Sequence, residues 1–223
     1  MSTLYPNFVW FHLLLFVFWL GGDLGVFVLG QNFRRRSYSL PERLVLLKML
    51  VAIDMGPRSA WALMVPSSLT LLYAGNWWPG LPLTAVIAAW AIGLAWLWLV
   101  WDAHAHDMTP RAARDRQIEG WLRWALTAFY LGLGGVSLAT GEPLAPTWLA
   151  TKALMFGAIF AAAIMIDHAF NPVGPQLMAL IAQGSIDATE VPLRATMDGT
   201  RRWVMAVYAL LFATSWLGVV KPF

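Results

Sequence analysis

Six apolar stretches, each near the length that crosses a lipid bilayer, constrain this chain more than any other feature. A transmembrane helix needs about 20 predominantly apolar residues. Only 12% of the residues are charged, which is about half the share found in soluble domains. The sequence therefore predicts an all-α integral membrane protein, in which residues 1–223 form a single bundle of six transmembrane helices. The six stretches lie at about 8–30, 50–74, 82–106, 119–140, 147–169 and 199–220.

Lysine and arginine collect in alternate connections of this predicted bundle. The loops NWWPGLP (76–82) and GEPLAP (141–146) carry none. Cytoplasmic loops are enriched in Lys and Arg, so both termini are predicted to face outward. The net charge of +3 follows from these basic loops, and we expect the lipid bilayer, with no nucleic acid, as a partner. The basic residues that follow the first and third stretches, or that lie around the start of the sixth, are Arg34, Arg35, Arg36, Arg43, Lys48, Arg111, Arg114, Arg116, Arg194, Arg201 and Arg202.

The ionisable side chains inside the apolar stretches fall into two layers. Such side chains are costly in lipid and are functional candidates. At a rise of about 1.5 Å per residue, His12 and Lys152 lie roughly 6–8 Å below the outer surface. A deeper layer lies roughly 22–30 Å from that surface by the same rise. It consists of Asp23, Asp54, Arg58, Asp102, Asp167 and His168, with His104 and His106 just beyond.

The outer layer offers two groups that can meet between the first and fifth stretches. A neutral imidazole such as that of His12 can ligate heme iron or copper. Lys152 can ligate iron when deprotonated, pair with a heme propionate, or extend to the head groups. The alternative is that His12 only forms a hydrogen bond with a neighbouring helix.

The inner layer admits both catalytic and structural interpretations. Asp54 and Arg58 share a helix face at i,i+4 spacing, and they are either an internal ion pair or, with Asp23, catalytic groups. Asp23 forms a hydrogen bond to a neighbouring helix or relays protons between the layers. Carboxylate and imidazole ligands suit iron, manganese, zinc or copper. The candidate metal ligands of this layer are Asp102, His104, His106, Asp167 and His168.

Three segments resemble the membrane protoporphyrinogen oxidases of the HemJ type and the related CopD-like membrane domains. The first is FH, followed by Trp19 and Gly21-Gly22; the second is TWLATKALMFGAIF (147–160), with Trp148 and Lys152; the third is the ending WLGVVKPF. The resemblance implies a heme b protein of the bacterial cytoplasmic (inner) membrane, with His12 as heme ligand and Lys152 as its functional partner.

These observations favour a heme b-binding membrane oxidoreductase, related to protoporphyrinogen oxidation and acting on a small hydrophobic or porphyrin-like substrate. One alternative is a metal-handling protein, either a copper permease or a non-heme dinuclear oxidase that uses the inner Asp and His residues. Another is a noncatalytic subunit that anchors a larger membrane complex or a homo-oligomer.

Overall fold

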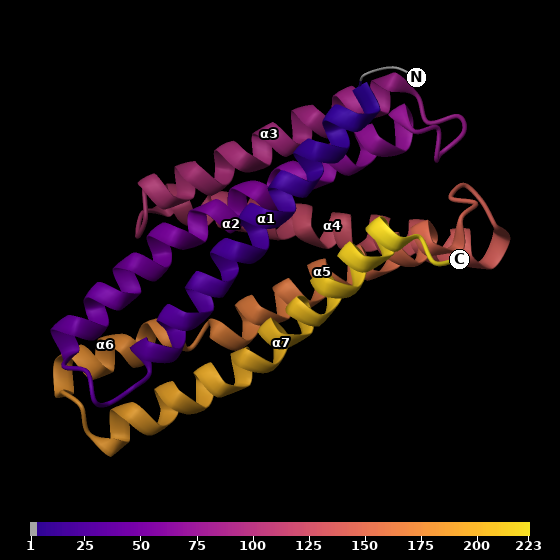
Figure 1. The fold of residues 1–223 in the computed structure, drawn as a ribbon. Coiled ribbons are helices and arrows are strands. Elements are labelled where there is room, and N and C mark those ends of the chain that lie inside the picture. The colour runs from indigo at the N-terminus through magenta and orange to yellow at the C-terminus, as the bar shows by residue number, and fades with distance from the viewer. Residues whose placement is uncertain (1–3) are drawn as a thin grey trace.

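The computed structural model describes residues 4–223, and helices make up nearly all of this part of the chain (Figure 1). No β-strand occurs within residues 4–223. The predicted all-α class is confirmed. The helices are α1 (Leu4–Phe33), α2 (Leu40–Ala74), α3 (Leu83–Ala105), α4 (Pro110–Thr140), α5 (Thr147–Phe170), α6 (Val173–Gln183) and α7 (Asp187–Val220).

Five of these helices, α1, α3, α4, α5 and α7, are long and apolar enough to cross a membrane. Helix α2 is the longest, at 35 residues, but it is not among these five. It carries Asp54, Arg58 and two prolines, Pro57 and Pro66, in its interior. It begins at Leu40, ten residues before the predicted second stretch, and is continuous to Ala74.

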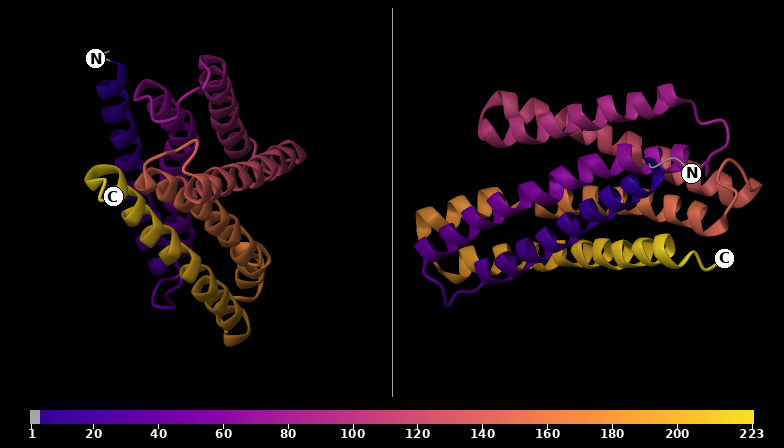
Figure 2. Two further views of the ribbon diagram at one scale, coloured as in Figure 1. Left: turned by 90° about the vertical axis from the view of Figure 1, so that its right-hand side faces the viewer. Right: turned by 45° about the horizontal axis from the view of Figure 1, so that its top comes forward.

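The helices pack mainly against neighbours in the sequence. Helix α1 lies on α2, α2 on α3, and α4 on α5, while α7 returns along α5. The start of α1 and the end of α7 lie at the same end of the bundle, as two views show (Figures 1 and 2). The loops α1–α2 and α6–α7 lie at the opposite end, which we call the inner end (Figure 1).

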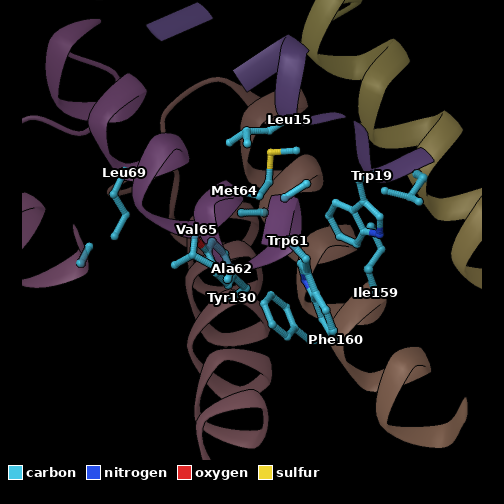
Figure 3. Packing of buried hydrophobic residues seen from close by; sticks show 14 of the residues in the cluster. Leu15, Trp19, Trp61, Ala62, Met64, Val65, Leu69, Tyr130, Ile159 and Phe160 are labelled. Carbon is cyan, nitrogen blue, oxygen red and sulfur yellow. The ribbon is translucent and has the colours of Figure 1, made fainter. Parts of the chain in front are cut away.

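An aromatic cluster joins five helices, and Figure 3 shows its members Trp19, Trp61, Tyr130 and Phe160. Trp19 stacks on Trp61 with ring centroids 5.6 Å apart, and Trp61 lies 4.8 Å from Phe160. Aromatic pairs in such geometry contribute about 0.5–1.5 kcal/mol beyond their buried area. The cluster consists of Trp19 (α1), Trp61 (α2), Trp96 (α3), Tyr130 (α4), Phe156 (α5) and Phe160 (α5).

Two glycines set the close approach of α4 and α5. A Cβ atom on Gly134 would lie 2.7 Å from Leu154 Cα, and one on Gly157 would lie 2.7 Å from the backbone nitrogen of Leu131. Small residues permit such contact between helix backbones. Of the glycine pair at 21–22, Gly22 has the same role, because its Cβ would collide with the ring of Pro57.

Ion pairs fasten the inner end. Arg43 and Glu190 form a buried pair at 2.6 Å, and Arg43 Nε also donates to the carbonyl oxygen of Phe33 at 2.7 Å. Arg34 pairs with Asp198, and Arg36 pairs with Asp187. Arginines of the basic segment between α1 and α2 therefore bind carboxylates of α7.

We expect Gly134→Ala and Gly157→Ala each to destabilise the protein by about 1–3 kcal/mol, because the added methyl group overpacks the α4–α5 contact. Thermal unfolding in detergent measures the change. Gly132→Ala is the matched control on α4, since a Cβ there meets no atom within 4 Å. Equal effects of all three substitutions would contradict the close-packing explanation.

Candidate functional site

Two cavities lie inside the bundle, one on each side of Trp19. The outer cavity, about 470 Å³, contains His12 and Lys152 in its wall, and the inner cavity, about 270 Å³, contains Asp23, Asp54 and other charged groups. Trp19 lines both and is only 4% exposed. The outer layer thus lines one cavity, and part of the inner layer, namely Asp23, Asp54, Arg58 and Asp167, lines the other.

The hydrogen bonds around His12 assign its tautomer. His12 Nδ1 lies 2.8 Å from the hydroxyl oxygen of Ser67, and this hydroxyl donates to the carbonyl oxygen of Met64 at 2.9 Å. A serine hydroxyl has one hydrogen, so its oxygen accepts the hydrogen bond from Nδ1–H. The other ring nitrogen, Nε2, therefore carries a lone pair, and the side chain lines the outer cavity. His12 thus forms a hydrogen bond with the neighbouring helix α2.

Two lysines give the outer cavity a positive charge. Lys152 lies against Gly218, where an added Cβ would collide with its Nζ. Lys221 Nζ stands over the rings of Trp77 and Trp148, 5.4 and 5.5 Å from their centroids. No Asp or Glu occurs among the described lining residues. The outer cavity therefore combines apolar and aromatic walls with cationic groups that attract an anion.

The inner cavity holds charges from several helices. Arg58 Nε donates to Asp54 at 2.5 Å, so the predicted ion pair on α2 is confirmed. Asp167 on α5 pairs with Arg123 on α4 at 2.5 Å. Asp23 also lines this cavity. The three groups suggested as catalytic, Asp23, Asp54 and Arg58, are therefore brought together.

The candidate inner metal ligands are not assembled in this fold. Within residues 4–223 no three His, Asp or Glu side chains are grouped so as to hold a metal ion. Asp102 is held by two hydrogen bonds from Arg111, both 2.6 Å, and Asp167 is held by Arg123.

The histidines suggested for the same metal site are exposed. His106 Nδ1 lies 3.0 Å from the backbone carbonyl oxygen of Asp102 and 3.4 Å from its carboxylate oxygen. His104 and His168 lie on the surface. The neighbouring Asp107 accepts a hydrogen bond from Arg116, and this bond holds the pKa of its carboxyl below the usual range. A helical His-x-His spacing places its two imidazoles on different faces, so the pattern alone does not make a site.

Sequence reasoning missed three groups that shape the cavities: Ser67, Lys221 and Arg123. Ser67 is a fully buried hydroxyl, but serine within an apolar helix often bonds only its own backbone. Lys221 lies beyond the last helix, where a lysine is expected to be solvated. Arg123 lies within the predicted stretch 119–140, but its pairing with Asp167 of α5 depends on how α4 and α5 pack.

We predict that His12 is the Nδ1–H tautomer and that Ser67→Ala removes this preference, because Nδ1 loses its acceptor. Nitrogen NMR of histidine-labelled protein, with the signal assigned by His12→Gln, measures the tautomer. Ser67→Thr keeps a hydroxyl and is the matched control. A His12 signal of the Nε2–H form in the unsubstituted protein would contradict the assignment.

Comparison of the chain with protein-family models, curated proteins and solved structures finds no match. The arrangement of the two cavities is therefore the basis for a functional proposal.

Proposed function

We propose that the protein is a membrane oxidoreductase that binds heme b in its outer cavity. The observation that carries the proposal is His12, whose Nδ1 is held by Ser67 and whose Nε2 lone pair belongs to a side chain in the cavity wall. Ligating histidines commonly have their second ring nitrogen fixed in this way. Histidine is also the usual protein ligand of heme iron.

The cavity suits a flat apolar group that carries carboxylates. Its volume of about 470 Å³ falls within the range of about 300–1,000 Å³ typical of ligand pockets. Aromatic and aliphatic side chains from α1, α2, α4, α5 and α7 form most of the wall. Lys152 and Lys221 supply positive charge for propionates, and no carboxylate in the described wall competes with them.

The roles of the chain's own residues follow from these contacts. His12 binds through Nε2, Ser67 keeps its ring in place, and Gly218 leaves space for Lys152. Trp77, Trp148 and Tyr5 lie around the Lys221 side of the cavity and limit access of water. A bound heme would supply one-electron chemistry, tuned by its axial ligand and surrounding polarity. The resemblance noted above suggests oxidation of a porphyrin-like substrate.

We further propose that all six apolar stretches, including α2, span the bacterial cytoplasmic membrane. Helix α2 fits this arrangement because its charged residues Asp54 and Arg58 pair with each other in the wall of the inner cavity. Polar groups at membrane depth characteristically face a protein interior and pair. Both termini then lie outside, and the arginine-rich inner end faces the cytoplasm.

This orientation is testable with single cysteines, because the chain has no native Cys. We expect a membrane-impermeant maleimide to label Ala145→Cys in intact cells, since residue 145 lies in the exposed α4–α5 loop. Ser37→Cys, exposed at the inner end, is the matched control and should react only after the membrane is opened. The reverse labelling pattern would contradict the orientation.

We expect detergent-purified protein to bind heme and to show a Soret absorption band. His12→Ala should abolish or strongly shift the band, because the axial nitrogen is lost, and Ser67→Ala should weaken heme affinity about 10–100-fold. Absorption spectroscopy during heme titration measures both effects.

The controls separate ligation from general damage. His104→Ala removes an exposed imidazole outside the cavity. Ser215→Ala removes a hydroxyl in the cavity wall that donates to the carbonyl oxygen of Phe212 on the same helix. Both should keep the Soret band. Protein that binds no heme, or that contains stoichiometric copper or zinc without porphyrin, would overturn the proposal.

A further inference from the structure

The inner cavity extends from the aromatic cluster toward the inner end of the bundle. On α1 its wall runs from Trp19 to Phe33, a helical length of roughly 20 Å at 1.5 Å per residue. On α7 it includes Met197, Thr200 and Arg201 near the inner end, and Tyr208 further in. The cavity therefore follows α1 and α7 over the inner half of the bundle.

The opposite end of this cavity is closed by Trp19 and Trp61. Their stacked rings are 4% and 8% exposed and form part of the hydrophobic core. Phe156 and Phe160 pack behind them. Water that enters the inner cavity thus meets an aromatic barrier before it reaches His12.

Asp23 differs from the other two carboxyl groups in the cavity wall. Asp54 and Asp167 each have an arginine at 2.5 Å. Asp23 takes part in no ion pair formed within residues 4–223. The Tyr208 hydroxyl donates to the backbone carbonyl oxygen of Asp23 at 2.8 Å, so this bond does not neutralise its carboxyl group.

The surroundings of Asp23 include both signs of charge from several helices. Two of the three arginines in the cavity wall, Arg58 and Arg123, are already paired with Asp54 and Asp167. An ionised carboxylate away from bulk water is costly unless it is paired. The charged and titratable groups of the same cavity are Asp54 and Arg58 on α2, Arg123 on α4, Asp167 on α5, and Arg201 and Tyr208 on α7.

We propose that Asp23 is a reversible proton-binding site that exchanges protons with the inner side of the membrane through this cavity. A hydronium ion in the cavity transfers its proton to a carboxylate oxygen of Asp23 and becomes neutral water, and in the reverse step the carboxylic acid returns this proton to water, which carries it out by the same route. The volume of about 270 Å³ accommodates several water molecules at about 30 Å³ each. The step involves no oxidant or reductant and does not depend on what the outer cavity binds.

Infrared difference spectroscopy of heme-free protein tests the proton on Asp23. A pH change should alter a carbonyl band of a protonated carboxylic acid that shifts in heavy water, shifts again in Asp23→Glu and is lost in Asp23→Asn. Asp198→Asn is the matched control, because Asp198 is a half-exposed carboxylate paired with Arg34, and it should retain the band. If Asp23→Asn does not fold, the Asp23→Glu shift decides. A spectrum that neither Asp23 variant changes would overturn the proposal.

Labelling of Asp23→Cys tests the side from which the cavity is reached. A small cationic thiol reagent should react several times faster when it is applied to inside-out vesicles than to right-side-out vesicles. Equal or reversed rates would overturn the route from the inner side. The vesicle orientation is established separately with Ala145→Cys and Ser37→Cys, so failure of this proposal is distinguishable from failure of the proposed topology or of heme binding.

Discussion

The contact between Trp19 and Trp61 determines how the interior of this bundle is divided. It joins the α1–α2 pair to Phe160 of α5 and separates the outer cavity from the inner one. The rings are large and nearly fully buried, and Trp19 lines both cavities, so the contact lies between them. Each cavity therefore has its own chemistry: imidazole and lysine in the outer cavity, and carboxyl groups with arginines in the inner one.

Charge pairing decides which polar groups remain available. Burying an unpaired charge is costly, and most carboxylates in the inner half accordingly have an arginine partner, as in Asp54–Arg58 and Asp102–Arg111. The buried Arg43–Glu190 pair ties α2 to α7 in the same way. Asp23, Lys152 and Lys221 form no ion pair within residues 4–223, and each of them lines a cavity.

Much of this arrangement is predictable from local sequence. Apolar length predicts the helices, and the helical rise correctly groups His12 with Lys152 and Asp23 with Asp54. The candidate metal ligands around His104 and His106 are not grouped within residues 4–223, because depth along a helix says nothing about which face a side chain occupies. The partners of His12 and Asp167, namely Ser67 and Arg123, depend on helix rotation and neighbours.

The sequence by itself determined the class of protein and the depth of its polar groups, because apolar run length and a fixed rise per residue are properties of the chain alone. Only the tertiary structure decided which of those groups meet. The glycine contacts at Gly22, Gly134 and Gly157 set how closely the helices approach. The aromatic cluster fills the space between the two cavities, both of which Trp19 lines. Their packing turned one layer of imidazole and lysine, and another of carboxyl groups, into two separate cavities.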